Sequence, residues 1–369
     1  MKKNKIKIQP KVSVTTGSLA TAAALASLKT ILGMDEKIQE IKIETPIETL
    51  NIIIKNNEKI SPNKAKSSCV KYPYDDPDVT IGLDIISIVE LKDRINDTEN
   101  KIEIIGGEGV GIITKPGLQI KPGSAAINPI PREMIRKNLE KILPYNKIAT
   151  VKIIIPKGKL IAKKTMNPRL GITDGISILG TTGIARSMDN TAYKNSIVTQ
   201  IDIAIAEKKE NLIFVPGNIG EKLALKKLKV KKDEIIQTGN FIGFMFDEAK
   251  KRGIDSFTFF GHIGKLVKVA GGIFNTKHSV ADGRCEIFAA HSALAGAKKE
   301  VIIKIFEAKT TEEIIRILEK EKLNTVVLNS IANAIKEKCL DKYDLKIDII
   351  LVDMEGNILN TNHSSKLIK

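Results

Sequence analysis

The pattern of strand-like and helical runs changes near Pro144, and this change of rhythm constrains the fold more than any other feature of the sequence. Before Pro144, short runs rich in β-forming residues succeed one another with little helix between them, at 39–44, 49–56, 80–91 and 101–105. That succession predicts a mainly antiparallel sheet. After Pro144, strand-like apolar runs alternate with helical patterns, which predicts a parallel α/β layer. We therefore expect two domains, an α+β domain over residues 1–146 and an α/β domain with a helical tail over residues 147–369.

The formal net charge of +16 narrows the class of partner. The chain has 59 Lys and Arg residues against 43 Asp and Glu residues, and its lysines are dispersed rather than blocked. A strongly basic chain suits either a nucleic acid or a small molecule with many carboxylates. Aromatic residues for base stacking make up only 4% of the chain, and we find no nucleic-acid-binding motif, which favours the small molecule.

Cysteine usage and the N-terminal residues indicate a cytoplasmic protein. The three Cys residues form no paired motif, which is typical of a reducing compartment. The first ten residues are basic and lack the apolar stretch of a signal peptide. No apolar run approaches the ~20 residues of a membrane span, so we expect no membrane partner.

The motif T-T-G occurs twice, at 15–17 and at 181–183. The first copy precedes an Ala- and Leu-rich run, so it predicts the capped start of a helix over about residues 18–32. Paired hydroxyls and backbone N–H groups at such a place also form an anion site. We therefore expect substrate contacts from both copies, with helix capping alone as the alternative, and name Thr15, Thr16, Thr181 and Thr182.

Residues 165–184 and 260–286 are rich in glycine interleaved with polar side chains. Glycine at this density marks tight turns or close approach of the backbone to a bound molecule. Arg169 and Lys265 each lie in such a stretch. We expect these two cations to bind carboxylates of the substrate in a cleft between the two domains.

Two glycine loops are candidates for a cofactor site. The first, G-x-G-x-G over residues 107–111, is followed by a stretch rich in Pro and Gly that excludes the helix a nucleotide loop requires. We interpret it as a turn between strands and keep Glu108 as a candidate substrate residue. The second, V-P-G-N-I-G over residues 215–220, lies between a strand and a helix, where open α/β sheets bind ligands. This position predicts cofactor contacts from Gly217, Asn218 and Gly220, with a plain strand-to-helix turn as an equal alternative.

His262 follows a predicted strand end in G-H-I-G-K, where a catalytic group would be presented. Imidazole titrates near neutral pH, so we predict that His262 is a general base, with an ordinary hydrogen-bonded loop histidine as the alternative. Asp282 in A-D-G-R is expected to orient it, and the alternatives are a pairing of Asp282 with Arg284 or Lys265, or a contact of Asp282 with the substrate. The remaining His and Cys residues match no short paired metal spacing, so we expect no protein-bound metal. A loop of clustered carboxylates, which could raise one another's pKa, contains Asp75, Asp76 and Asp78.

These motifs together carry a resemblance to a known family. The matching stretches run over roughly residues 10–300 and include T-T-G-S-L-A-T-A-A-A, D-D-P-D-V-T, G-G-E-G-V-G-I-I-T-K-P-G-L, A-I-N-P-I-P-R, T-M-N-P-R-L-G-I, G-I-S-I-L-G-T-T-G-I, N-F-I-G, G-H-I-G-K-L-V-K and A-D-G-R. In these stretches the chain resembles the cobalt-precorrin-5B (C-1)-methyltransferases of the anaerobic cobalamin pathway. It departs from the family pattern at Lys71–Tyr74 and at Thr276–Ser279, where one residue is inserted.

The resemblance implies an enzyme that moves a methyl group from S-adenosylmethionine to ring carbon 1 of cobalt-precorrin-5B, giving cobalt-precorrin-6A. It implies a fold unlike that of the usual tetrapyrrole methylases. It also implies a cobalt-corrinoid substrate with many acetate and propionate arms, which matches the excess of Lys, and it leaves a homo-oligomer open. Two alternatives stay open at this point, a methyltransferase for a related metal-free precorrin and a basic nucleic-acid-binding protein without enzymatic activity.

Overall fold

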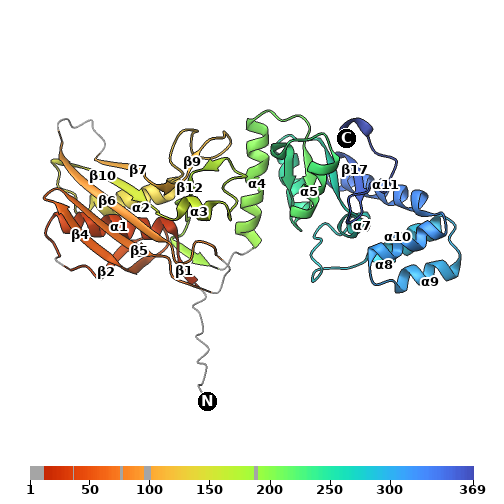
Figure 1. Cartoon of the computed structure of the whole chain (residues 1–369), viewed down its shortest axis with the longest axis horizontal. Helices are drawn as coiled ribbons and strands as arrows, with labels where there is room; N and C mark the ends of the chain where they lie inside the picture. The colour runs from red at the N-terminus through yellow and green to blue at the C-terminus, as the bar shows by residue number, and fades with distance from the viewer. Residues whose placement is uncertain (1–11, 36, 75–77, 95–100, 187–189) are drawn as a thin grey trace, which may run out of the picture. The chain divides into compact units, whose positions relative to one another are not determined.

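The computed structural model describes residues 12–35, 37–74, 78–94, 101–186 and 190–369. The chain divides into two compact units, Met1–Ala192 and Tyr193–Lys369 (Figure 1). Each unit has its own hydrophobic core. The division therefore lies further along the chain than the change of rhythm near Pro144.

A five-stranded sheet forms the body of the first unit, with strand order β4-β5-β6-β10-β7. Every neighbouring pair is antiparallel except β10 and β7, which are parallel, so the expected mainly antiparallel sheet is confirmed. Its strands are β4 (Asn56–Ser61), β5 (Lys64–Val70), β6 (Asp84–Asp93), β7 (Ile102–Gly106) and β10 (Lys147–Ile154). Strand β10 explains the displaced boundary, because its apolar run completes this sheet instead of opening the second unit.

Helix α1 (Thr16–Ile31) lies along β5 and β6 and packs against α2 (Pro129–Glu140) (Figure 1). Alanines at 22, 23, 24 and 26 are fully buried, and such small side chains allow the helix close to the sheet. The strands alternate buried and less buried residues along β6, as expected of a sheet with one covered face.

Shorter elements complete the first unit. Two-stranded pairs join β1 to β13, β2 to β3, β8 to β12 and β9 to β11. These elements are β1 (Val12–Val14), β2 (Glu40–Glu44), β3 (Thr49–Ile53), β8 (Gly109–Val110), β9 (Ile112–Ile113), β11 (Ile172–Thr173), β12 (Gly175–Ile176), β13 (Ile184–Arg186) and helix α3 (Gly158–Ala162).

The second unit contains a four-stranded, wholly parallel sheet with strand order β15-β14-β16-β17. This confirms the expected parallel α/β layer. The strands are β14 (Ile213–Val215), β15 (Ile235–Gln237), β16 (Ser256–His262) and β17 (Lys346–Val352). Its helices are α4 (Asn190–Ala206), α5 (Asn218–Lys227), α6 (Ile242–Lys251), α7 (Ile263–Ala270), α8 (Arg284–Leu294), α9 (Lys299–Glu307), α10 (Thr311–Lys320) and α11 (Asn324–Tyr343), with 3-10 turns at Lys232–Glu234 and Ser365–Leu367.

Both faces of this parallel sheet are buried, which explains the continuous apolar runs of its strands. On β14, Phe214 belongs to one core cluster while Ile213 and Val215 belong to the cluster on the other face. The first cluster is aromatic, with the rings of Phe214 and Phe257 stacked at a centroid distance of 4.0 Å. No helix within the described residues combines the length and the apolar character that crossing a bilayer requires.

The strand order places a topological switch point between β14 and β16. From β14 the chain crosses through α5 to β15 on one side, and from β16 it crosses through helices α7 to α11 to β17 on the other side. Loops that leave neighbouring strands in opposite directions open a crevice at the carboxyl ends, where ligands bind in open α/β sheets. The candidate site is built at this edge.

Candidate functional site

The loop after β14 has a bare backbone at the switch point. Gly217 has φ 90°, a conformation that side chains rarely adopt, and a Cβ atom built on it would meet nothing within 4 Å. Gly220 packs the first turn of α5 onto the strand, since its Cβ would lie 3.1 Å from Cβ of Val215. Asn218 is the first residue of α5. The structure thus brings the three predicted cofactor residues to one loop with open space beside it.

Gln237, at the carboxyl end of β15, holds that loop in place. Its Nε2 donates to Oδ1 of Asn218 at 2.9 Å and to Oε2 of Glu221 at 2.5 Å. Both Gln237 and Glu221 are buried. This pair was not predicted from the sequence, although Gln237 stands at the end of the strand that follows the glycine loop, a position where site residues are expected.

His262 is the last residue of β16 and the N-cap of α7. Its Nδ1 accepts a hydrogen bond from the backbone N–H of Gly264 at 3.2 Å. Its Nε2 lies 2.8 Å from Oε1 of Glu312, in the first turn of α10. The carboxylate that orients His262 is therefore Glu312, and the expectation that Asp282 would do so is corrected.

Asp282 instead holds its own loop. Its carboxylate accepts from Nε and Nη2 of Arg284 at 2.8 and 2.7 Å and lies 3.1 Å from Nδ1 of His278. Hydrogen bonds from Arg284 are the main reason why the pKa of Asp282 falls to about 2. This is the pairing with Arg284 that the sequence left open, and the guanidinium lies only two residues along the chain.

A pocket of about 380 Å³ opens beside His262. Lys265 lies in it, half-buried, with Nζ 3.1 Å from the amide oxygen Oδ1 of Asn240. Burial, together with the charge of Lys268, holds the pKa of Lys265 below its usual range. The pocket combines one histidine, three cations and one carboxylate in a single recess, lined by His262, Gly264, Lys265, Arg284, Lys309, Thr310, Thr311, Glu312 and Met354.

The two T-T-G motifs meet in the first unit. Backbone N–H of Thr15 donates to the carbonyl of Gly183 at 3.1 Å, and Thr15 caps α1 through the N–H of Ser18. Thr16 exchanges hydrogen bonds with the backbone of Leu179. Both threonines are buried, so the fold alone accounts for their hydroxyls, and their contribution to substrate binding stays a prediction.

The other substrate candidates of the first unit are more accessible. Thr181 and Glu108 are exposed, while Thr182 and Arg169 are half-buried. Their roles stay predictions. Of the acidic loop, Asp75 and Asp76 lie outside the described residues, and Asp78 forms an ion pair with Lys71 at 2.7 Å.

The G-x-G-x-G stretch is a structural device, as the sequence interpretation predicted. A Cβ atom on Gly109 would lie 1.8 Å from the carbonyl oxygen of Ile155. Gly158 and Gly175 press on the carbonyl of Gly109 from two further elements, with Cβ positions 2.0 and 2.2 Å from it. Three backbone segments thus converge where no side chain fits, and no nucleotide loop forms there.

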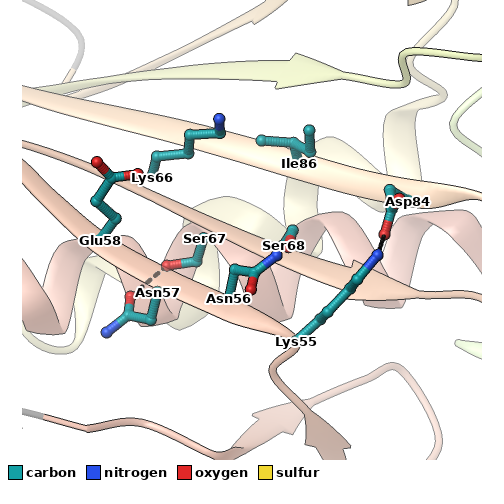
Figure 2. A pocket seen from close by; sticks show the side chains of 9 residues that line it. All are labelled: Lys55, Asn56, Asn57, Glu58, Lys66, Ser67, Ser68, Asp84 and Ile86. Carbon is teal, nitrogen blue, oxygen red and sulfur yellow. Dashed lines mark hydrogen bonds and ion pairs between the residues drawn. The ribbon is translucent and has the colours of Figure 1, made fainter.

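A second pocket, of about 330 Å³, lies on the first unit's sheet. Figure 2 shows it bounded by the ion pair of Lys55 and Asp84, with Ser68 and Ile86 on the neighbouring strands. It contains none of the predicted site residues. Within the described residues, no group of three or more His, Cys, Asp or Glu side chains is placed to hold a metal ion.

Comparison with protein families gives two matches. The family described as CbiD matches residues 2–187, and the family described as CbiD, C-terminal domain, matches residues 275–363. The first match ends close to the boundary between the two compact units.

Several curated proteins are similar over nearly the whole chain, and each is named cobalt-precorrin-5B C(1)-methyltransferase. The protein from Methanobrevibacter smithii is 60% identical over 96% of this chain and 98% of its own length. The protein from Methanosphaera stadtmanae is 50% identical over 96% of this chain and 92% of its own. A crystal structure of cobalamin biosynthesis protein (cbiD) from Archaeoglobus fulgidus is 24% identical, covers 73% of this chain and 83% of that one, and gives a TM-score of 0.37.

Proposed function

The chain belongs to the CbiD family, and from that premise we propose that it methylates ring carbon 1 of cobalt-precorrin-5B to give cobalt-precorrin-6A. The observation that carries the proposal is the match, over nearly full length, to relatives that bear this activity in their names. The proposal includes S-adenosylmethionine as the methyl donor and a cytoplasmic location. A nucleic-acid partner is not part of it.

We assign the methyl donor to the switch point between β14 and β16, because ligands bind at such points in open α/β sheets. When bound, S-adenosylmethionine would supply an electrophilic methyl group on a positively charged sulfur; the macrocycle would provide the electron pair of the new carbon–carbon bond, and the pair of the broken carbon–sulfur bond would stay on sulfur. Gly217 offers bare backbone and free space for close approach. Asn218, held by Gln237, and Gly220 complete the loop. This chain mainly has to align donor and ring, and alignment lowers barriers by several kcal/mol.

His262 acts in this proposal as the base for a ring proton, with Glu312 behind it. Because Glu312 accepts from Nε2, we assign the imidazole proton to Nε2 and the basic lone pair to Nδ1. That lone pair faces the N–H of Gly264 at 3.2 Å, a contact that must open for proton uptake. Asp282 supports the site from the neighbouring loop through Arg284, which lines the same pocket.

The test is anaerobic incubation of the protein with cobalt-precorrin-5B and S-adenosylmethionine, followed by mass spectrometry. We expect a product heavier by one methyl group and an equal amount of S-adenosylhomocysteine. A parallel incubation with the metal-free macrocycle separates the cobalt substrate from a related precorrin. If correctly folded protein and authentic substrate give no mass shift, the proposed function is wrong.

A further inference from the structure

Lys265 is a half-buried cation whose hydrogen-bond partner, the side chain of Asn240, carries no charge. Its Nζ contacts Oδ1 of Asn240 at 3.1 Å, and within the described residues no carboxylate forms an ion pair with it. Removing an ammonium from water without a counter-ion is costly. The nearby Lys268, itself buried, bonded to the carbonyl of Ala281 and 3.8 Å from Oδ1 of Asp282, adds repulsion. An anion beside Lys265 would offset both the cost of removing the ammonium from water and the repulsion by Lys268.

Further cations from separate elements line the same pocket. Lys309 precedes α10 and is exposed, while Arg284 begins α8 and is held by Asp282. The pocket's own carboxylate, Glu312, is engaged by Nε2 of His262 and by the hydroxyl of Thr311 at 3.2 Å. The one carboxylate in the lining is therefore already hydrogen-bonded, and the three cations leave the pocket with an excess of positive charge.

The pocket is small for a macrocycle. Its volume of about 380 Å³ lies near the lower end of pockets that enclose drug-sized ligands, roughly 300–1,000 Å³. It suits a flexible arm that ends in a carboxylate. Because His262 shares the lining, an arm seated here would bring the ring that carries it to the carboxyl end of β16.

We propose that this pocket is a subsite for one carboxylate arm of the substrate, in which Lys265 and Lys309 bind the carboxylate. The inference rests on the proposed function for the identity of the arm, but the site itself lies wholly within the second unit. It adds Lys309 to the substrate residues that the sequence suggested. Arg284 has a different role in this proposal: it lines the pocket, but its charge is paired with Asp282.

The experiment uses the whole chain, with propane-1,2,3-tricarboxylate as the probe and its neutral triamide as the matched control. Binding is followed by calorimetry and by amide chemical-shift changes of Gly264, Thr310 and Thr311. Lys265→Met should weaken tricarboxylate binding at least about tenfold, because a charge-assisted contact in a desolvated place is lost. Lys309→Met should weaken it about threefold, because that side chain is exposed. Lys304→Met on α9 removes the same charge outside the pocket and should leave binding within about twofold.

Three outcomes would overturn the subsite. They are equal binding of the triamide, equal losses in Lys265→Met and Lys304→Met, and shift changes that lie away from the pocket. If Lys265→Met fails to fold, Lys265→Arg, which keeps the charge, and Lys309→Met decide the matter. The probe needs neither methyl donor nor macrocycle, so a failed methyl-transfer assay and a failed subsite are distinguishable.

Discussion

The glycine-rich stretches of the two units look alike in the sequence and do opposite things in the structure. In the first unit, the carbonyl of Ile155 occupies the place where a side chain on Gly109 would be. The carbonyl of Gly109 in turn occupies the place where a side chain on Gly158 would be. In the second unit, Gly217 also has a positive φ, but a Cβ atom built on it would meet no atom within 4 Å. Glycine in one unit lets the backbone meet itself, whereas glycine in the other leaves the backbone bare at an edge where ligands bind.

The same contrast holds for hydroxyl and charged groups. The hydroxyl of Thr15 caps its own helix through Ser18, and the hydroxyl of Thr16 bonds to the backbone of Leu179, just before the other T-T-G motif. Lys265 and His262, in the second unit, line a pocket. A dense polar glycine motif therefore identifies a place of close approach, and only the surrounding fold determines whether the approaching group is protein or ligand.

The largest expected effect concerns the tightly packed glycines of the first unit. Gly109→Ala forces a Cβ atom into the carbonyl of Ile155 and should lower the free energy of unfolding by at least about 3 kcal/mol. Gly82→Ala in the same unit, with φ 79° and an empty surrounding, should cost only about 1 kcal/mol. Urea unfolding measures both. Equal losses in the two variants would mean that the convergence at Gly109 is not a tight packing site.

The next effect concerns the catalytic role proposed for His262 in the second unit. His262→Gln should lower turnover about a hundredfold, because the positioned base is lost. Binding of S-adenosylhomocysteine should stay unchanged. His291→Gln, which alters a histidine bonded to Ser330 elsewhere in the unit, is the control and should keep most activity. Normal turnover of His262→Gln would leave His262 a structural cap and the reaction dependent on alignment alone.

The cofactor loop gives a third test. Gly217→Val should raise the dissociation constant of S-adenosylhomocysteine at least about tenfold, because the side chain fills the space beside the loop. Gly253→Val is matched to it, with φ 77° and nothing within 4 Å, but lies after α6 and away from the loop. Calorimetry on both variants separates backbone strain from lost ligand space. Similar affinities in the two would place the cofactor elsewhere.

The repeated T-T-G motif offers a smaller, two-sided test. Thr15→Ala removes the cap of α1 and should lower the free energy of unfolding by about 1 kcal/mol. Thr181→Ala, at an exposed position, should leave stability within about 0.5 kcal/mol while weakening substrate binding. Chemical unfolding and a substrate titration are measured on each. The reverse pattern would make the first copy of the motif the binding copy.

The smallest effect concerns acid. The pKa of Asp282 is lowered to about 2 by Arg284, so its ion pair stabilises the native state fully above the ordinary carboxyl pKa. That contribution is lost as the pH falls from about 4 towards 2. In thermal melts over this range, Asp282→Asn should show a shallower loss of Tm than the wild type. Parallel curves would mean that the pair contributes nothing to stability.

Local patterns predicted the layers of both units because periodicity and glycine or proline punctuation are local properties. The helix expected over about residues 18–32, which the structure has at Thr16–Ile31, the parallel sheet and the structural character of residues 107–111 are confirmed. The boundary was misplaced because a buried apolar run such as β10 reads the same whichever sheet it completes. Such information lies in the pairing partner, not in the run.

The candidate site was predicted only in part, for a related reason. The glycine loop and His262 stand at strand ends, and strand ends are visible in the sequence. Glu312 was missed because it lies fifty positions after His262, in a charged helical turn that reads as an ordinary solvated face. The expectation for Asp282 failed because the sequence shows which carboxylates are near in the chain but not which are near in space.

Parallel pairing of β16 with β17 has a consequence for biosynthesis on the ribosome. Ser256 to His262 find their partners Lys346 to Val352 only after helices α7 to α11 have been made. Closing so long a connection makes this pairing a late step of folding. His262, paired with Val352, therefore reaches its final place when synthesis of the sheet is finished. The recess beside His262, whose lining includes Met354 after β17, can therefore form only once β17 has been made.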